Sequence, residues 1–321
     1  MIILTGGAGF IGSCFLRKLN NEGINDVLVV DHLGAGNKWK NLSNKKFVDF
    51  VNKDQFPEKL KSGYYQGDID AIIHLGACSS TTETDADYLI QNNYNYSKFL
   101  AEYAADNNIK FIYASSAATY GDGSNGYEDK EYLSLQPLNA YGFSKHIFDL
   151  WVLENQLENQ FVGLKFFNVF GPNEYHKEEM SSMIYKSYFQ IINTGKIKLF
   201  KSNDSKYGNG EQKRDFIYVK DAIQIMWQLL NDKSISGIFN LGTGHSRSWN
   251  NLANAVAASL NLDSQIEYID IPVEITKQYQ NFTEANMNKL IQAGIDYKFP
   301  SLEENVNDYI VQYLSKNQSI Y

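Results

Sequence analysis

Cysteine is scarce in this sequence: only Cys14 and Cys78 occur among its 321 residues. Cys14 falls in a stretch predicted as a helix and Cys78 follows a predicted strand, so we expect no structural disulfide between them. Such sparse cysteine is typical of a reducing compartment. The sequence therefore favours an intracellular, cytoplasmic protein.

Long hydrophobic runs and clusters of positive charge are absent as well. No apolar run approaches the roughly 20 residues that span a bilayer. The strand-like stretch IILT begins at Ile2, which leaves no room for a signal peptide. With a formal net charge of -8 and no basic run, nucleic acid and anionic membranes are poor partners. An anionic ligand would have to meet local cations.

Short apolar runs alternate with helix-period stretches through the first half of the chain. The runs predicted as strands are 2–5, 27–30, 71–75, 110–114 and 162–168. Between the first two, an apolar stripe at helical spacing is formed by Ile11, Phe15, Leu16 and Leu19. This alternation predicts a parallel sheet covered by helices on both faces.

The pattern loosens in the second half of the chain. Residues 202–213 (SNDSKYGNGEQK) are predicted as a surface loop, and residues 237–242 (GIFNLG) as a buried strand followed by a helix. A chain of this length exceeds what one core supports. We expect an α/β fold with a doubly wound parallel (Rossmann) sheet over 1–170. About 213–240 would return to it, and a smaller C-terminal α/β substrate lobe would cover 171–321.

TGGAGFIG, at residues 5–12, follows a predicted strand and opens a predicted helix, as a dinucleotide-binding loop requires. Gly6 allows the tight turn, Gly9 lets the backbone approach a pyrophosphate, and Gly12 lets helix pack on strand. The helix N-terminus offers N–H groups and partial positive charge to phosphates. A glycine turn without a ligand is the competing interpretation.

Asp31 ends the second predicted strand, about 20 residues beyond the glycine loop. A carboxylate there binds ribose hydroxyls and repels a 2′-phosphate, which favours NAD. Lys38 and Lys53 lie nearby in sequence, and a lysine can neutralise a 2′-phosphate, which favours NADP. The residues alone leave this choice open.

LNAYGFSKH places Tyr141 and Lys145 four residues apart, so both lie on one face of a helix. Lowering a phenol pKa from about 10 to about 7 takes about 4 kcal/mol of preferential phenolate stabilisation. An ammonium and a nicotinamide cation can supply it, after which Tyr141 would accept a substrate hydroxyl proton. Upstream, YASSAATYG exposes Ser116 at a strand end, where it would bind the reacting oxygen. An isolated Tyr/Lys pair on the surface is the competing interpretation.

These features together resemble the extended short-chain dehydrogenase/reductase superfamily over essentially the whole chain. The resemblance implies a nicotinamide cofactor on the first lobe and a nucleotide sugar on the second. Sugar dehydratases of this superfamily carry an Asp-Glu pair where this chain has Ala117 and Ala118, so dehydration would lack its acid and base. Epimerases, reductases and decarboxylases remain.

Six stretches resemble the ADP-L-glycero-D-manno-heptose 6-epimerase family of lipopolysaccharide core synthesis. They are GGAGFIGS, HLGACSSTTETD, NNYNYSK, YASSAATYG, FFNVFGPNEYHKEEM and KRDFIYVKD. The resemblance implies inversion of C6 through a 6-keto sugar, with Tyr141 serving one face of the ketone and Lys177 the other. A solvated loop lysine is the competing interpretation of Lys177, and neighbouring His176 has no obvious partner in the sequence.

The same resemblance implies one tightly bound NADP per subunit. Asp31 and His32 would border the adenosine ribose, while Lys38 and Lys53 would meet the 2′-phosphate. The other residues implied at the cofactor are Phe10, Ile11, Leu75, Gly76, Ala77, Cys78, Ser79, Asn92, Lys145, Val169 and Lys177. No metal site is expected.

On the substrate side, the residues implied to contact the ADP-sugar are Asn168, Phe200, Lys201, Ser202, Asn203, Arg214 and Tyr279. A guanidinium at Arg214 suits bidentate pyrophosphate binding, although Arg214 could instead pair with Asp215 at the surface. Glu179 and Lys186 are also expected at the substrate, but the family carries serine and histidine there. The 202–213 loop is longer than usual in the family. These departures concern substrate contacts more than chemistry.

Two rival functions stay open from the sequence. A 4-epimerase or 4-reductase acting on a UDP- or GDP-sugar needs the same Tyr141 and Lys145 but only one base, so replacing Lys177 would discriminate. An NADP-binding redox sensor without catalysis would usually have lost the tyrosine or the lysine. Family resemblance also implies a homo-oligomer, with a homopentamer as the expectation, and a Gram-negative source.

Overall fold

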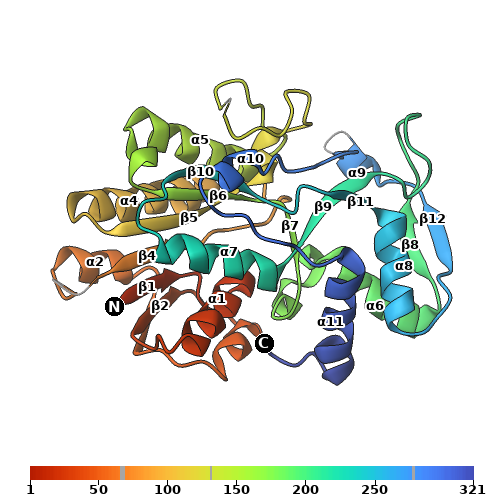
Figure 1. Cartoon of the computed structure of the whole chain (residues 1–321), viewed down its shortest axis with the longest axis horizontal. Helices are drawn as coiled ribbons and strands as arrows, with labels where there is room; N and C mark the ends of the chain where they lie inside the picture. The colour runs from red at the N-terminus through yellow and green to blue at the C-terminus, as the bar shows by residue number, and fades with distance from the viewer. Residues whose placement is uncertain (66–68, 131, 277–278) are drawn as a thin grey trace.

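The larger lobe is built on a seven-stranded sheet in which every neighbouring pair is parallel (Figure 1). The computed structural model describes residues 1–65, 69–130, 132–276 and 279–321. The sheet, in spatial order, consists of β10 (Gly237–Leu241), β6 (Val162–Phe166), β5 (Lys110–Ser116), β4 (Ala71–His74), β1 (Ile2–Thr5), β2 (Val27–Asp31) and β3 (Asp49–Asn52). The predicted doubly wound α/β fold is confirmed.

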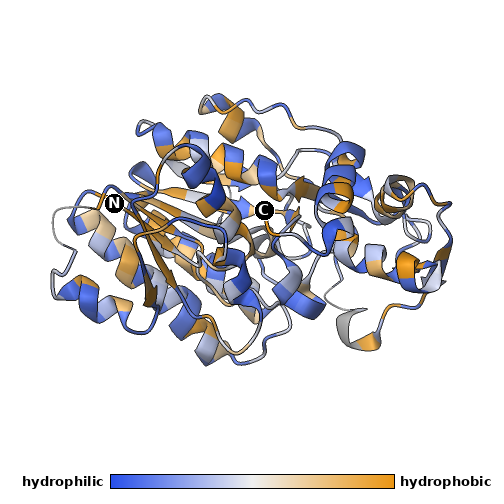
Figure 2. Ribbon diagram, turned by 90° about the horizontal axis from the view of Figure 1, so that it is seen from below, coloured by the Kyte–Doolittle hydropathy of each residue, from blue (hydrophilic) through white to orange (hydrophobic). Residues whose placement is uncertain are grey.

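Helices cover both faces of this sheet because its central strands are apolar on both sides. In β1, Ile2 and Leu4 join the core that contains Phe15 of α1, while Ile3 joins the opposite core, which contains Phe148 of α5. Figure 2 shows the hydrophobic strands enclosed by helices whose outer faces are hydrophilic. The longer helices of this lobe are α1 (Phe10–Asn21), α4 (Tyr96–Asp106), α5 (Ala140–Glu154) and α7 (Val219–Asn231).

The smaller lobe holds two short sheets, lying at the right of Figure 1. One has the order β11-β9-β7 and the other pairs β12 with β8. Their bounds are β7 (Asn168–Phe170), β8 (Ile197–Phe200), β9 (Lys213–Tyr218), β11 (Ser246–Ser248) and β12 (Ile266–Ile269). Helices packed there are α6 (Met183–Thr194), α8 (Trp249–Ser259) and α11 (Leu302–Gln312).

The remaining elements are short. They are the α-helices α2 (Phe56–Lys61), α3 (Ala86–Leu89), α9 (Val273–Thr276) and α10 (Asn288–Gln292), the π-helix η2 (Ile90–Asn95), and the 3₁₀ turns η1 (Lys38–Leu42), η3 (Ala117–Tyr120), η4 (Leu157–Asn159), η5 (Tyr175–Met180) and η6 (Leu314–Lys316). Within the described part of the chain, no helix is long and apolar enough to cross a membrane. Cys14 and Cys78 are both free thiols.

Two features differ from the sequence expectations. The apolar run at 162–168 is not one strand, because the chain leaves the large sheet at Phe167 and continues as β7, which pairs with β9. Of the segment 213–240, α7 and β10 lie with the larger lobe, whereas β9 belongs to the smaller sheet. Residues 202–212 form turns between β8 and β9, in agreement with the predicted loop.

Candidate active site

A cleft of about 780 Å³ opens at the carboxyl ends of the larger sheet. One wall comes from the loops after β1, β4 and β5 and from the start of α5, while residues within 166–186 and Trp249 form the other. Strand order reverses between β1 and β4, and ligands of doubly wound sheets bind outside the strand ends at such a reversal. The cleft is therefore the candidate active site.

The glycine loop after β1 packs so tightly that side chains at Gly6 and Gly12 would collide with the backbone. A Cβ atom on Gly12 would lie 2.1 Å from the Gly6 carbonyl oxygen. Gly6 has a φ of +69°, and its Cβ would lie 2.7 Å from the Gly76 nitrogen. Helix α1 begins after Gly9, which has no side chain that could cap it, so the first N–H groups of the helix are available to an anion in the cleft.

Asp31, at the end of β2, is held by three donors. Its Oδ2 accepts from the Ala8 N–H at 2.9 Å, and its Oδ1 accepts from the His32 N–H at 2.7 Å and from Lys38 Nζ at 2.5 Å. Asp31 and Lys38 line the cleft, whereas His32 is exposed beside it. The carboxylate that would repel a 2′-phosphate thus carries a lysine counter-ion.

Lys53 and Asn92 hydrogen-bond to each other and do not line the cleft. Lys53 Nζ donates to the Asn92 side-chain oxygen, and its ammonium lies 3.8 Å from Asp54. The neighbouring Asn93, in the π-helix, donates to the Cys78 carbonyl oxygen at 2.9 Å and to Ser144 Oγ at 3.0 Å. The π-helix therefore ties the loop that carries Cys78 to α5.

Helix α5 presents Tyr141 and Lys145 to the cleft. Asn139 caps the helix by accepting from the Gly142 N–H at 2.8 Å, which fixes where the first turn begins. Lys145 Nζ donates to the Ala114 carbonyl oxygen at 2.9 Å, and burial lowers the Lys145 pKa to about 8. Burial raises the pKa of Tyr141, against a hydrogen bond with Ser116 that lowers it. The chain alone therefore keeps Tyr141 protonated at neutral pH.

Lys177 reaches the opposite part of the cleft from η5. Its Nζ lies 5.7 Å from the centre of the Phe10 ring, and burial lowers its pKa while the Glu174 carboxylate raises it. Glu174 is buried and accepts from the Ser182 N–H at 2.6 Å and from Ser182 Oγ at 2.7 Å. A buried carboxylate beside this segment thus keeps the ammonium form accessible.

His176 also lines the cleft, and the structure gives it a partner that the sequence did not reveal. Its Nδ1 lies 3.3 Å from Asn41 Nδ2, and burial lowers the His176 pKa to about 4. His176 is therefore a neutral imidazole near pH 7. Asn41 lies more than a hundred residues away along the chain, so no local pattern pointed to it.

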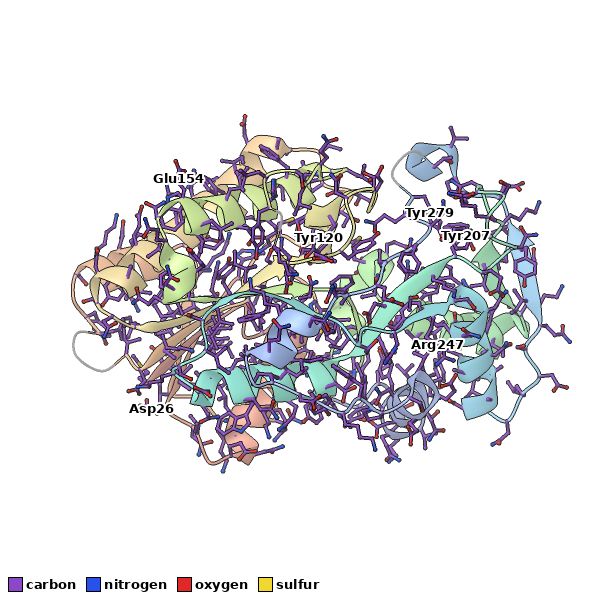
Figure 3. All side chains as sticks on the ribbon, turned by 45° about the horizontal axis from the view of Figure 1, so that its top comes forward. Asp26, Tyr120, Glu154, Tyr207, Arg247 and Tyr279 are labelled. Atoms are coloured by element: carbon purple, nitrogen blue, oxygen red, sulfur yellow. The ribbon has the colours of Figure 1, made fainter. Side chains whose placement is uncertain are left out.

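Arg214, in β9, is buried within an aromatic cluster. Its guanidinium carbon lies 5.5 Å from the Trp249 ring centre and 5.3 Å from that of Tyr279, whose ring also packs on Phe200. Arg214 donates to the Lys213 carbonyl oxygen at 2.9 Å and to that of Gln280. Figure 3 labels Tyr279 beside Tyr207, to the right of Tyr120. Trp249 connects this cluster to the cleft, which it lines.

The alternative of a surface pair between Arg214 and Asp215 is wrong. Both residues are buried, and the Asp215 carboxylate accepts instead from the N–H groups of Thr243, Gly244 and Ala285 at 2.8 to 3.0 Å. Alternating strand geometry sends successive side chains to opposite faces of β9, so neighbours in sequence do not meet. Arg214 is thereby directed away from Asp215.

The two residues that depart from the family pattern contact each other. Lys186 Nζ donates to the Glu179 carbonyl oxygen at 2.5 Å and lies 3.5 Å from its carboxylate. Lys186 lines the cleft, but the Glu179 side chain is 98% exposed. Two other predicted substrate residues have partners of their own. Lys201 pairs with Asp270 at 2.9 Å on the surface, and Ser202 Oγ donates to the Asp204 carbonyl oxygen within the same loop.

The cleft thus collects only part of the predicted set. The predicted residues that line it are Phe10, Ile11, Asp31, Lys38, Leu75, Gly76, Ala77, Cys78, Ser79, Ser116, Tyr141, Lys145, Asn168, Val169, Lys177 and Lys186. Those outside its lining are His32, Lys53, Asn92, Glu179, Phe200, Lys201, Ser202, Asn203, Arg214 and Tyr279. Lining residues that sequence reasoning missed include Thr81, His176, Met180, Ser182, Phe216 and Trp249.

The family model described as "NAD dependent epimerase/dehydratase family" matches residues 2–242 of the chain. The chain belongs to this family. Membership agrees with the glycine loop, the strand-end serine and the Tyr141–Lys145 pair, all of which the epimerase/dehydratase family model spans.

Individual relatives within the epimerase/dehydratase family narrow the comparison. An ADP-L-glycero-D-manno-heptose-6-epimerase of Nitratidesulfovibrio vulgaris (strain DP4) is 50% identical over 317 residues, covering 98% of each chain. The crystal structure of the Helicobacter pylori enzyme of the same name has a TM-score of 0.83 and 29% identity, covering 97% of this chain and 95% of that one. A UDP-N-acetylglucosamine 4-epimerase from Methanobrevibacter ruminantium M1 gives 0.82 and 26%, covering 98% of each.

The cleft fits the nicotinamide dinucleotide that the family name implies. Side chains on Gly6 or Gly12 would collide with neighbouring backbone, so these glycines keep the loop tight, and the uncapped start of α1 offers N–H donors to a diphosphate. Asp31 stands at the ribose position, at the end of β2. Residues from both lobes complete the walls of the cleft.

Proposed function

We propose that this protein is an NADP-dependent epimerase that converts ADP-D-glycero-β-D-manno-heptose to ADP-L-glycero-β-D-manno-heptose by inverting C6. The observation that carries the proposal is that Tyr141 and Lys177, from different lobes, line one cleft. It is supported by 50% identity along nearly the whole chain to a relative of that name. In this role the product is a precursor of the lipopolysaccharide inner core.

Inversion at C6 requires that a proton and a hydride leave and return. Tyr141 accepts the proton of the C6 hydroxyl when that hydroxyl points toward α5, and Ser116 hydrogen-bonds the same oxygen. A nicotinamide bound in the cleft would accept the hydride and return it, and its oxidised form would add a positive charge near the phenol. Because burial raises the pKa of Tyr141, that charge and the Lys145 ammonium must offset the desolvation cost before the phenol can act as a base.

Lys177 acts on the opposite face. After the C6 end of the 6-keto sugar rotates, the keto oxygen points away from Tyr141. A proton donor is then needed on the opposite wall of the cleft. The Lys177 ammonium donates that proton, and in the reverse reaction the free amine accepts it. Burial lowers the Lys177 pKa, which favours release of the proton, while the Glu174 carboxylate raises it.

NADP rather than NAD is proposed because Lys38 can change partners. In the chain alone Lys38 neutralises Asp31 at 2.5 Å. A 2′-phosphate at the adenosine ribose would offer Lys38 a second, doubly charged partner at the same place, while the N–H groups of Ala8 and His32 continue to hold Asp31. Lys53 would reach the phosphate only by leaving Asn92.

The ADP moiety would bind where Trp249, in the cleft lining, meets the buried cluster of Arg214 and Tyr279. Trp249 and Tyr279 flank the Arg214 guanidinium, which can donate to the pyrophosphate in a bidentate manner. Asn168 and Lys186 lie closer to the reacting sugar, since both line the cleft. We further propose that the first lobe binds the cofactor and the second the nucleotide sugar, in a cytoplasmic homo-oligomer of a Gram-negative bacterium.

The direct test is to incubate the purified protein with ADP-D-glycero-β-D-manno-heptose and follow C6 by NMR. We expect equilibration of the two C6 epimers, with the C4 configuration unchanged. Parallel reactions with UDP-glucose and UDP-N-acetylglucosamine test the rival, a nucleotide-sugar 4-epimerase. Inversion of C4 in either UDP-sugar, with no change at C6 of the heptose, would replace the proposal by the rival.

A further inference from the structure

The end of the sequence lies against the segment that carries Lys177. The Tyr175 hydroxyl donates to the Ser319 carbonyl oxygen at 2.9 Å, and the Tyr321 N–H donates to Asn173 Oδ1 at 2.9 Å. The Tyr185 hydroxyl donates to Gln318 Oε1 at 3.2 Å. Figure 1 shows the C-terminus beside the first helices rather than at the far end of the smaller lobe. Residues 318–321 are called the tail below.

The tail is seated on the larger lobe by contacts of its own. Lys45 Nζ donates to the Tyr321 carbonyl oxygen, and Asn44 Nδ2 donates to that of Ile320 at 3.3 Å. The Lys220 ammonium lies 5.3 Å from the centre of the Tyr321 ring. These contacts hold the tail between the segment after η1 and the start of α7.

Asn173 joins the tail to α1 and the glycine loop. It is buried, and its Nδ2 donates to Ser13 Oγ at 2.9 Å on α1. Asn41 Nδ2 lies 3.0 Å from the Asn173 carbonyl oxygen and 3.0 Å from that of Ala8 in the glycine loop. The Asn173 side chain thus contacts both the tail and α1, and Asn41 joins the Asn173 backbone to the glycine loop. Asn173 lies in the segment that leads to Lys177.

The backbone at Lys177 needs such external support. The next residue, Glu178, has φ +47° and ψ −116°, a region that residues other than glycine rarely adopt. The 3₁₀ turn η5 starts at Tyr175 without a side-chain cap. A turn this short, with an unfavourable dihedral pair, is held in place by its tertiary contacts rather than by its own hydrogen bonds.

We propose that the tail is a positioning strap. Through Asn173 and Tyr175, the tail holds Lys177, the proposed second base, against the glycine loop. The inference rests on the proposed two-base epimerase and adds a role for residues that lie outside the cleft. Its consequence is selective: loosening the strap displaces Lys177 but leaves Tyr141, which α5 holds through its own cap and through Asn93 and Ser144.

The test compares deletion of residues 319–321 with Tyr175→Phe and with Lys316→Ala, an exposed control whose ammonium bonds only one turn back to Gln312. Each C6 epimer is mixed separately with excess cofactor-loaded enzyme, and the 6-keto sugar is trapped with borodeuteride and counted by mass spectrometry. Hydrogen exchange is measured in parallel over peptides 173–182 and 140–154. Cofactor affinity is measured by titration.

We expect the deletion to slow ketone formation from one epimer by roughly tenfold to hundredfold, and the same epimer must be the one that Lys177→Met blocks. Tyr175→Phe, which loses one hydrogen bond, should slow that epimer by about fivefold. Exchange should rise over 173–182 and stay unchanged over 140–154, with cofactor affinity unchanged. Lys316→Ala should match the wild type throughout.

The results separate the strap from the function on which it rests. Equal slowing of both epimers, or no change in exchange over 173–182, would overturn the strap. If the deletion variant does not fold, Tyr175→Phe decides by the same selectivity between epimers. No ketone from either epimer with the wild-type protein would instead overturn the proposed function.

Discussion

The ammonium of Lys165 lies 2.7 Å from Asp149 Oδ2, and both side chains are fully buried between α5 and the large sheet. Asp149 also accepts from Ser115 Oγ at 2.7 Å and from the Tyr113 hydroxyl at 3.1 Å. It lies one helical turn after Lys145, whose pKa is lowered by burial and raised in part by the Asp149 carboxylate. This charge pair therefore joins α5 to β5 and β6 close to Tyr141 and Lys145, the proposed catalytic pair.

Asp149→Asn should destabilise the protein strongly. It leaves the Lys165 ammonium buried without its counter-ion, which costs about 3–5 kcal/mol in free energy of unfolding. Urea unfolding measures this loss. The matched control is Lys130→Ala, which removes an exposed ammonium 3.3 Å from Glu128 and should cost less than about 1 kcal/mol. Equal stability of Asp149→Asn and wild type would mean that the buried pair does not hold α5.

His74 should make stability depend on pH below neutrality. It is buried between Thr5 Oγ1, at 2.6 Å, and Ser97 Oγ, at 2.8 Å, and burial lowers its pKa from 6.5 to about 3. Between those values the unfolded chain binds a proton that the folded chain does not, so the free energy of unfolding falls as pH decreases from 6.5 toward 3. The slope approaches about 1.4 kcal/mol per pH unit.

His74→Gln removes this titration. The difference in unfolding free energy between wild type and His74→Gln, measured by urea at several pH values from 7 down to 4, should therefore shrink steadily as the pH falls. Carboxylates titrate in both proteins and cancel in the difference. A difference that stays constant with pH would show that His74 takes up its proton at the same pH in the folded and the unfolded protein.

Lys38→Met should weaken NADP more than NAD. The 2′-phosphate loses its cation and meets an Asp31 carboxylate that no longer has its partner at 2.5 Å, so we expect at least a tenfold preferential loss, or about 1.4 kcal/mol. Titration of both cofactors measures the ratio. Lys40→Met, at an exposed lysine of the same turn, is the control. An unchanged ratio in Lys38→Met would place the phosphate elsewhere.

Arg214→Lys should impair substrate binding despite keeping the charge. An ammonium can neither stack between the Trp249 and Tyr279 rings nor donate two parallel hydrogen bonds to a pyrophosphate. We expect KM for the ADP-sugar to rise about tenfold to hundredfold, or about 1.4–2.8 kcal/mol, with kcat changed far less. A fall in kcat at unchanged KM would assign Arg214 to the chemical step instead.

Local sequence patterns predicted the central strands because those strands are buried along their length. β1, β2 and β4 each consist of buried residues, so apolar runs mark them. β3 was not predicted, since only Val51 of DFVN is buried at the edge of the sheet. The break at Phe167 was missed for the opposite reason: the chain stays apolar through it, and only pairing with β9 separates β7 from β6.

Local sequence patterns likewise predicted only part of the candidate site. Tyr141 and Lys145 could be found because helical spacing alone places them together. The partners of Lys53, His176 and Arg214 could not, because each contact joins segments far apart in the sequence. The tail is the extreme case, since its contact with Asn173 spans 148 residues and its own sequence carries no motif.

The two-base account is tested most directly by trapping the 6-keto sugar in a single turnover of Tyr141→Phe and of Lys177→Met. Each variant, loaded with cofactor, is mixed in excess with one C6 epimer at a time. The account predicts reciprocal results: Tyr141→Phe forms ketone from only one epimer, and Lys177→Met forms it only from the other. If Lys177→Met forms ketone from both epimers at wild-type rates, the claim that Lys177 is the second base is contradicted.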